Sequence, residues 1–174
     1  MKNITYWLEE IVIGLNLCPF AKQPYKNGLV RVVISEAIDE HEQITFFLNE
    51  LQHLQNEPSS KISTTIIAYT RENKNFQDFN NFVGILENLL IQSGLEEHFQ
   101  LVAFHPQFQF DEIELTSPAN WVGRSPYPIV HLLRNSEIEM ALANNLNMEQ
   151  IPMLNEEKLR ALSQEELSKI FYYL

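Results

Sequence analysis

Apolar residues recur every three or four positions in two long stretches of the chain, the spacing that gathers side chains on one face of a helix. This pattern predicts helices over residues 40–55 and 76–93. Asp39 and Glu42 form a capping-box pattern at the start of the first stretch. Gly94 follows the second stretch, where a residue suited to the left-handed conformation commonly ends a helix.

Shorter helical patterns lie near the two ends of the chain. An apolar stripe over 4–15 predicts an amphipathic helix with Asn3 as its N-cap. A further helix is expected to begin near Glu137. Asn155 and Ser163 are candidate caps for helices in the tail.

Three segments rich in β-branched residues predict strands over 30–34, 62–69 and 99–104. They alternate with the two long helices, an order that favours parallel strands joined by right-handed crossovers. The predicted architecture is therefore a single α/β domain over 1–174, with a mainly parallel sheet of three or four strands and flanking helices. A split arrangement with one antiparallel strand accommodates the same two crossover helices.

The segment from 105 to 134 is irregular, because its prolines prevent any long regular element. It is the longest candidate for a functional loop. Its last residues, 129–134, fit either a helix or a strand. A helix would place His131 and Arg134 on one face, whereas an extended chain would point them to opposite sides.

Composition narrows the classes of function. The net charge is −11 and the 12 Lys and Arg residues do not cluster, which argues against nucleic acid and anionic membrane surfaces as partners. A small anionic ligand is compatible, since a pocket can be locally positive inside an acidic protein. The single cysteine, the absence of signal-peptide features and the absence of a run of ~18 apolar residues predict a cytoplasmic protein. The oligomeric state is left open.

Cys18 is the first candidate for chemistry. A thiolate is a strong nucleophile when a cation or a helix N-terminus lowers its pKa. Cys18 should follow the C-terminal end of the first helix, where the dipole opposes ionisation. The residue is therefore either a nucleophile activated by a tertiary neighbour or an inert, buried cysteine. Asn16, two positions earlier, is a candidate substrate-binding residue.

Two histidines are candidates for catalytic proton transfer. His105 is expected at the end of a strand, where it is either a general acid or base or a ring that hydrogen-bonds a backbone carbonyl. His131 is the second candidate. Both are also suitable metal ligands, but no closely spaced ligand pair supports a metal site, so none is predicted. The chain has neither a P-loop nor a dinucleotide fingerprint, and the cofactor stays unknown.

A proline-rich stretch supplies candidate substrate-binding residues, namely Arg124, Ser125 and Tyr127. Guanidinium groups suit bidentate binding of carboxylate or phosphate, so Arg124 is the candidate for holding an anion. Arg134 is a further candidate, for which a structural salt bridge is the stronger interpretation.

These stretches resemble a bacterial family, domain-of-unknown-function family 1415, over nearly the whole chain. The matching residues are Trp7, Val12–Ala21, Phe104–Pro106, Arg124–Pro128 and His131–Arg134. The resemblance implies no reaction and lends no catalytic assignments. The chain departs from it at Gly123, where the family pattern commonly has Asn. If that Asn side chain binds ligand, the site in this chain is altered.

These residues lead to two main hypotheses. The first is an enzyme acting on a small anionic metabolite, with Arg124 holding the anion and Cys18 as nucleophile. His105 or His131 would transfer protons, and the hypothesis predicts that Cys18, His105 and Arg124 face one cavity. The alternative is a non-enzymatic module that binds a metabolite or a metal in the same pocket. A third reading is an interaction protein that docks a partner through aromatic residues, which are Trp121, Tyr127, Phe171, Tyr172 and Tyr173.

Overall fold

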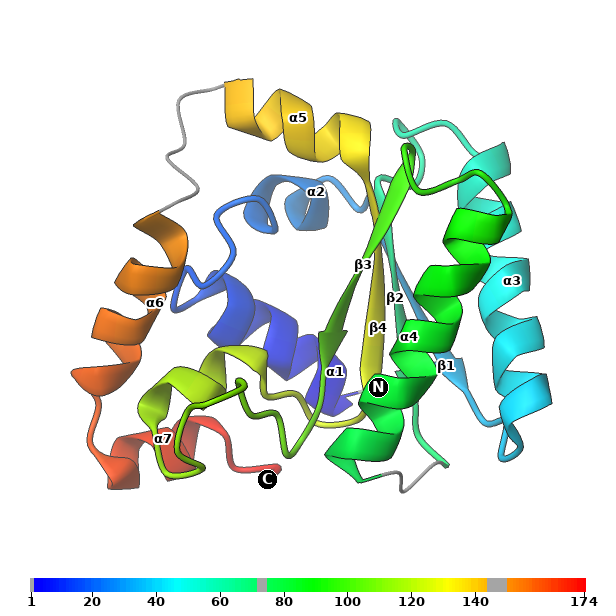
Figure 1. Cartoon of the computed structure of the whole chain (residues 1–174). Helices are drawn as coiled ribbons and strands as arrows, with labels where there is room; N and C mark the ends of the chain where they lie inside the picture. Colours follow the sequence, from blue (N-terminus) through cyan, green and yellow to red (C-terminus); the bar gives the residue numbers. More distant parts are fainter. Residues whose placement is uncertain (1, 72–74, 144–149) are drawn as a thin grey trace.

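The computed structural model describes residues 2–71, 75–143 and 150–174. It contains a four-stranded sheet with helices on both faces (Figure 1). The strands are β1 (Val30–Ser35), β2 (Thr64–Tyr69), β3 (Phe99–Phe104) and β4 (Ile129–Arg134). The three predicted strands are thus confirmed, and the segment whose form the sequence left open is a fourth strand.

The strand order is β1-β2-β4-β3, with β1 parallel to β2 and β4 antiparallel to both of its neighbours. The prediction of a mainly parallel sheet is therefore wrong, since the sheet is mixed and mostly antiparallel. The strands β1, β2 and β3 do run in the same direction, but β4 is inserted between β2 and β3. The crossover helices that suggested a parallel sheet fit this split arrangement equally well.

Two long helices cover what we call the first face of the sheet (Figure 1). α3 (Glu40–Asn56) is capped by Asp39, whose carboxylate accepts a hydrogen bond from the Glu42 N–H at 2.9 Å. α4 (Phe76–Gln92) ends just before Gly94, whose φ of 64° confirms the predicted glycine beyond the helix end. Their apolar stripes pack on alternate residues of the strands and form the first hydrophobic core.

Shorter helical segments cover the second face, and residues of most of them form the second hydrophobic core with it (Figure 1). They are α1 (Lys2–Tyr6) with the π-helical continuation η1 (Trp7–Ile13), α2 (Lys22–Lys26), the 3-10 segment η2 (Pro118–Gly123), α5 (Asn135–Ala143), α6 (Ile151–Arg160) and α7 (Gln164–Ile170). Within the described ranges, no helix is long and apolar enough to cross a membrane.

Two predicted helix caps need correction, and one is confirmed. The first helix already includes Lys2, so Asn3 lies inside its first turn and is not the N-cap. Asn155 is buried within α6, where its amide bonds another part of the chain instead of a helix start. Ser163 does cap α7, in a capping box with Glu166.

The aromatic residues proposed as a docking surface are mostly part of the second core. Phe171 is buried, and its ring lies 4.7 Å from that of Trp121. Tyr127 and Tyr173 are half-buried and pack against the same core. Tyr172 is the exposed member of the set. The arrangement therefore gives these residues a packing role and leaves little of the proposed surface.

Arg134, at the end of β4, ties the sheet to the end of α3. Its guanidinium donates hydrogen bonds to the backbone carbonyls of Leu54, Glu57 and Ile62 at 2.5, 2.6 and 3.2 Å. Carbonyls at a helix C-terminus lack partners within the helix, and a cation there also meets the negative end of the helix dipole. Arg134 is thus structural, although it bonds carbonyls and not the carboxylate of a predicted salt bridge.

We predict that Arg134→Met lowers the free energy of unfolding by roughly 2–3 kcal/mol, because charged donors are lost and half-buried carbonyls are left unpaired. Arg134→Lys should recover part of the loss, since an ammonium cannot reach the carbonyls as a fork does. Urea denaturation measures both. The control is Arg160→Met, whose exposed pair with Glu156 should contribute less than about 1 kcal/mol. Equal losses at the two positions would contradict the structural role.

Candidate functional site

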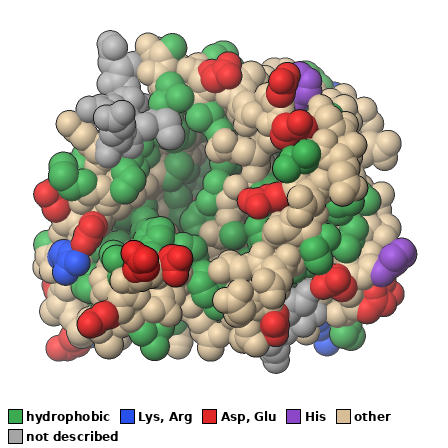
Figure 2. All heavy atoms as spheres, in the orientation of Figure 1, with side chains coloured by type: hydrophobic (Ala, Val, Ile, Leu, Met, Phe, Trp, Pro, Cys, Tyr) green, Lys and Arg blue, Asp and Glu red, His purple; other side chains and the backbone are tan. Residues whose placement is uncertain are grey.

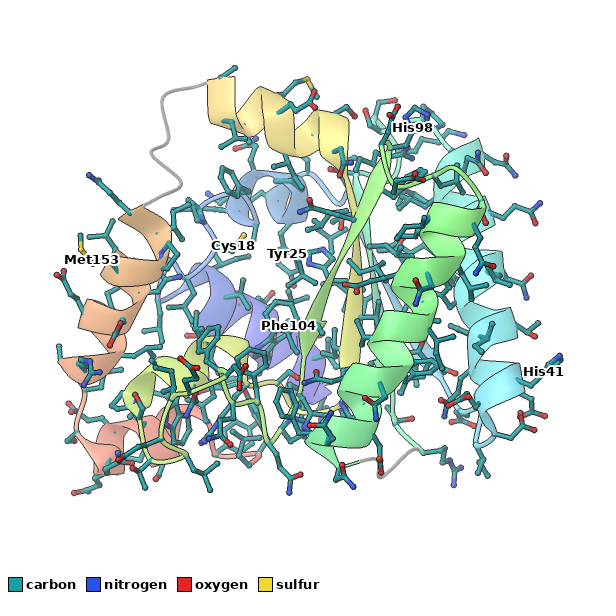
Figure 3. All side chains as sticks on the ribbon, viewed as in Figure 1. Cys18, Tyr25, His41, His98, Phe104 and Met153 are labelled. Carbon is teal, nitrogen blue, oxygen red and sulfur yellow. The ribbon has the colours of Figure 1, made fainter. Side chains whose placement is uncertain are left out.

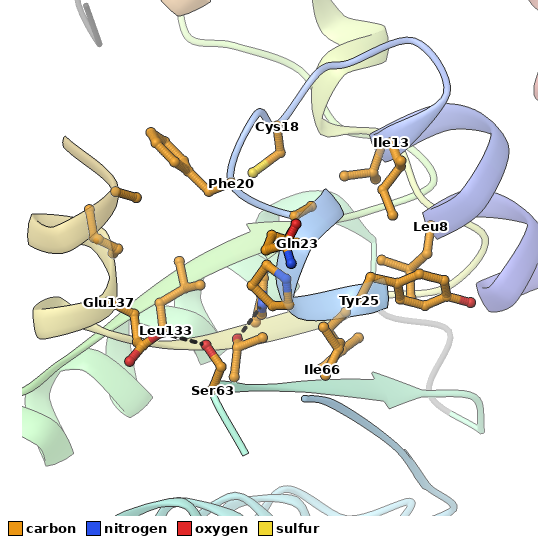
Figure 4. Close-up of a pocket in the computed structure, with 18 of the residues that line it drawn as sticks. Leu8, Ile13, Cys18, Phe20, Gln23, Tyr25, Ser63, Ile66, Leu133 and Glu137 are labelled. Atoms are coloured by element: carbon orange, nitrogen blue, oxygen red, sulfur yellow. Dashed lines mark hydrogen bonds between the residues drawn. The ribbon is translucent and has the colours of Figure 1, made fainter. Parts of the chain in front are cut away.

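A cavity of about 380 Å³ lies between the second face of the sheet and the helical layer. Its floor comes from β2 and β4, its walls from η1 and α5, and its roof from residues 18–25 (Figure 4). Cys18 and Tyr25, labelled in Figure 3, belong to the roof. Figure 2 shows a hollow with hydrophobic side chains on its walls below α5. The lining is predominantly apolar, so the few polar groups in it define what the cavity can recognise.

Strand alternation places His131 in the cavity floor. Val130 and Leu132, on either side of it in β4, belong to the first core, so His131 faces the opposite side of the sheet. In the register of the sheet, His131 lies beside Ile66 of β2, which belongs to the second core. A titratable ring therefore stands on an otherwise apolar sheet face.

Thr64 fixes the orientation of the His131 ring. The Thr64 Oγ1 atom lies 2.6 Å from the Leu132 carbonyl oxygen and 2.5 Å from His131 Nε2. A carbonyl can only accept, so the hydroxyl donates its proton to Leu132 and accepts from the ring nitrogen. The imidazole is thus held with the proton on Nε2. The other nitrogen, Nδ1, has no hydrogen-bond partner among the described residues.

Burial lowers the pKa of His131 from 6.5 to about 4, because the apolar surroundings disfavour the imidazolium. No anionic partner offsets this effect among the causes of the shift. The ring is therefore uncharged at neutral pH, and its Nδ1 lone pair is available as a hydrogen-bond acceptor.

The loop that carries Cys18 is held in place by α6. Lys158 Nζ donates to the Asn16 carbonyl at 2.9 Å, and Asn155 Nδ2 donates to the Leu17 carbonyl at 2.7 Å. Asn16 has a φ of 50°, a conformation that asparagine adopts more readily than most residues. Leu17 is thereby buried in the second core, and the Cys18 sulfur points toward the cavity (Figure 4).

Burial raises the pKa of the Cys18 thiol, and hydrogen bonds from the backbone N–H groups of Phe20 and Ala21 oppose the rise without cancelling it. The first helical segment ends at Ile13, and the Leu17 and Cys18 N–H groups donate to the Val12 carbonyl near its end at 2.9 and 3.3 Å. Cys18 thus follows the C-terminal end of this segment, as the sequence predicted. Desolvation is the largest cause of the raised thiol pKa.

Polar side chains at the edge of the cavity are engaged with one another. Ser63 Oγ donates to the Glu137 carboxylate at 3.1 Å, which joins the start of β2 to α5 (Figure 4). Tyr25 Oη donates to Glu9 at 2.8 Å, and Figure 4 shows its hydroxyl pointing away from the cavity. Gln23 is exposed at the roof. The edge therefore offers more unused acceptors than unused donors.

His105 lies outside the lining of this cavity. It is buried at the end of β3, and its ring packs against Phe76 and Phe79 of α4 with centroid distances of 5.5 and 5.4 Å. Its Nδ1 accepts a hydrogen bond from the Gln107 N–H at 3.0 Å. The strand end is where the sequence predicted, but the ring belongs to the side of the sheet covered by α4.

Arg124 also lies outside the lining. Its guanidinium stacks over the Trp121 ring at 4.4 Å and donates to the Leu115 carbonyl at 3.4 Å. Its own carbonyl accepts from Trp7 Nε1 at 3.0 Å. Burial lowers the pKa of Arg124, although an arginine stays charged at any physiological pH. These contacts join η2 to η1 within the second layer.

Ser125 and Tyr127 shape a turn next to Arg124. Ser125 is fully buried, and its hydroxyl donates to the Tyr127 carbonyl at 2.6 Å. The Tyr127 ring packs against the second core. Both residues therefore use their polar or aromatic groups within the fold.

Gly123 is required by packing against Phe108. A Cβ atom at position 123 would lie 2.3 Å from the Phe108 ring. The Gly123 carbonyl also accepts from the His105 N–H at 3.0 Å. In this chain an aromatic ring occupies the space that any side chain at position 123 would enter.

Of the predicted site residues, the cavity lining includes Cys18, His131 and Arg134. The Arg134 guanidinium itself bonds backbone carbonyls near the end of α3, on the first face of the sheet. The remaining predicted residues do not line the cavity, namely Asn16, His105, Arg124, Ser125 and Tyr127. The expectation that Cys18, His105 and Arg124 share one cavity is not met by it. In the part of the chain that the structure describes, no group of three His, Cys, Asp or Glu residues could hold a metal ion.

Sequence reasoning missed several polar residues of the cavity, namely Gln23, Ser63, Thr64 and Glu137. Ser63 and Thr64 stand at the start of an otherwise apolar, buried strand, and that contrast is the signal that could have marked them.

Comparison with known proteins gives one match. A family model described as "Protein of unknown function (DUF1415)" matches residues 1–169 of the chain. No curated protein and no solved structure matches it.

We predict that His131 makes folding sensitive to mild acid. The folded-state pKa of about 4 lies below the ordinary 6.5, so between these values the unfolded chain binds a proton that the folded chain does not. The stabilisation is therefore fully present above about pH 6.5 and is lost as the pH falls toward 4. Between pH 7 and pH 4, wild type should lose at most about 3 kcal/mol more than His131→Leu, measured by urea denaturation. Parallel pH profiles would contradict the burial of a neutral ring.

Proposed function

The chain belongs to the DUF1415 family, which is described as one of unknown function, and we propose a function from its geometry. We propose that the protein binds a small, uncharged and mainly apolar molecule. The observation that carries this proposal is the predominantly apolar cavity of about 380 Å³ between the sheet and the second helical layer. Small-molecule sites have this character, with a few placed polar groups that orient the ligand. The proposal develops the binding-module alternative and not the enzyme hypothesis.

The charges around the cavity favour an uncharged ligand over the anion expected from the sequence. Arg134 and Glu137 are its charged lining residues. The Arg134 guanidinium is bonded to backbone carbonyls near the end of α3, while the Glu137 carboxylate accepts from Ser63 at the edge. An anion would therefore lose its hydration without gaining an unused cation, which is costly in an apolar site.

The size of the cavity suits a ligand of roughly the size of a substituted aromatic ring. An engineered apolar cavity of about 150 Å³ takes up benzene and otherwise stays dry. A larger apolar cavity with a polar floor can hold a larger ring and orient it. Ring burial supplies affinity through the apolar area removed from water, at about 25 cal/mol per Å².

Covalent chemistry at Cys18 is a second candidate function, because Cys18 and His131 line the same cavity. The Phe20 and Ala21 N–H groups that bond the sulfur would also stabilise a thiolate there. Burial, however, favours the neutral form of both side chains. A reaction would thus need an electrophilic ligand such as an activated alkene, to which the sulfur and the thiol proton both add across the double bond, so that no group leaves.

We predict that the wild-type protein binds p-xylene in this cavity with a Kd on the order of 1 mM or below. Ala141→Trp should weaken this affinity at least about tenfold, because an indole from α5 would fill the space. NMR titration of backbone amide resonances measures the affinity. The matched control is Ala143→Trp, which adds the same ring to the same helix at an exposed position and should leave the Kd unchanged.

Two outcomes would contradict the proposed function. One is no binding of p-xylene by the folded wild-type protein. The other is binding that Ala141→Trp does not weaken, which would locate the ligand elsewhere.

We predict that iodoacetamide alkylates Cys18 more slowly in the folded protein than in the urea-unfolded chain at pH 8, because burial raises the pKa of the thiol and limits access. Saturating p-xylene should slow the folded-state reaction further, since it occupies the space at the sulfur. Mass spectrometry follows the modification, and Cys18→Ser gives the background. Faster alkylation in the folded protein would instead favour covalent chemistry as the function.

A further inference from the structure

The neighbours of His131 decide which of its two ring nitrogens can accept a hydrogen bond from a ligand. Thr64 Oγ1 must donate to the Leu132 carbonyl, so it accepts from Nε2 and leaves the Nδ1 lone pair unused. The ring lines the cavity, and Nδ1 is not among the fully buried polar atoms without a partner. The lone pair is therefore accessible from the cavity.

Hydrogen bonds already made around the cavity engage the hydroxyl donors of its lining, and the Gln23 amide at the roof donates to Asn27. The hydroxyls of Thr64, Ser63 and Tyr25 donate to Leu132, Glu137 and Glu9 respectively. The unused groups include the His131 Nδ1 lone pair and the second carboxylate oxygen of Glu137, and both accept. A thiol such as that of Cys18 is a weak donor. At the sheet floor the Thr64 hydroxyl is already used as a donor and His131 Nδ1 is an unused acceptor, so a ligand that supplies a donor there completes the hydrogen bonding.

From this geometry we infer that the ligand carries an uncharged hydrogen-bond donor, a hydroxyl or an N–H on an apolar ring, and that His131 Nδ1 accepts it. The chemical class is that of small phenols, indoles and alicyclic alcohols. This inference rests on the proposed function. His131 is then the residue that selects among apolar molecules of equal size, with Thr64 as its positioning residue.

The protein can discriminate between apolar ligands with and without a donor, because the two kinds of ligand leave His131 Nδ1 in different hydrogen-bonding states. A ring without a donor covers the lone pair and removes it from water without replacement, whereas a hydroxyl keeps it bonded. The preference for the donor is a difference between two ligands, so it can be separated from general affinity for apolar rings.

The test uses three probes that differ at one position, p-cresol, p-xylene and p-toluate, with wild type and His131→Leu. We expect the ratio of the p-xylene Kd to the p-cresol Kd to be roughly fivefold higher in wild type than in the variant. p-Toluate should bind most weakly to both. An unchanged ratio would overturn the inference, while loss of all binding to wild type would overturn the proposed function itself.

A spectroscopic reading of the wild-type ring does not depend on the variant. In the imidazole ¹⁵N spectrum at neutral pH, we expect Nε2 to carry the proton and Nδ1 to be unprotonated. Adding p-cresol should shift the Nδ1 resonance toward lower frequency, and p-xylene should not. A protonated Nδ1, or equal shifts with both probes, would overturn the inference even if His131→Leu fails to fold.

Thr64→Val tests the positioning role with the same readout. Without the acceptor for Nε2–H, the tautomer is no longer fixed, and the Nδ1 resonance should move toward the average of the two tautomers. The ratio of the p-xylene Kd to the p-cresol Kd should fall below the wild-type ratio. A wild-type spectrum in this variant would show that Thr64 does not set the tautomer.

Discussion

The strand β4 hydrogen-bonds to both β2 and β3, and its alternating side chains serve both sides of the molecule at once. On the first face, Val130 and Leu132 complete the first core, and Arg134 holds the end of α3. On the second face, His131 becomes the polar point of a mainly apolar cavity. A slip of one residue in the β4 register would exchange these sets, so the site and the packing of α3 depend on the same strand pairing.

The second helical layer then encloses the cavity without filling it. The bonds from α6 to the Asn16 and Leu17 carbonyls hold the loop above the sheet, and the Ser63–Glu137 bond holds α5 at the other side. Polar groups that frame the cavity are largely satisfied by one another, which lets an apolar space persist beside the core. His131 Nδ1 is an acceptor on the cavity floor without a partner among the described residues, and the proposed ligand class follows from it.

Much of the fold could be predicted from the sequence, because the two long helices and three strands have strong local patterns and clear caps. The position of β4 could not be predicted, because its pairing depends on long-range contacts. In addition, the split arrangement and the parallel arrangement use the same crossover helices. Cys18 and His131 were recognised by residue type. Residues 129–134 form a strand, so His131 and Arg134 point to opposite sides of the sheet, as an extended chain requires. His105 and Arg124 were also chosen by residue type, but they lie outside the cavity. His105 packs beside Phe79 and Arg124 stacks on Trp121, and these long-range contacts cannot be predicted from spacing in the sequence.

A crystal structure of the protein with p-cresol would locate the ligand and its hydroxyl together, and so show whether His131 Nδ1 accepts a hydrogen bond from it. We expect ring density between β4 and the Cys18–Tyr25 segment, with the hydroxyl oxygen within hydrogen-bond distance of His131 Nδ1. Density with the hydroxyl turned away from His131, or bound at Arg124 and Trp121 while the cavity stays empty, would contradict this expectation.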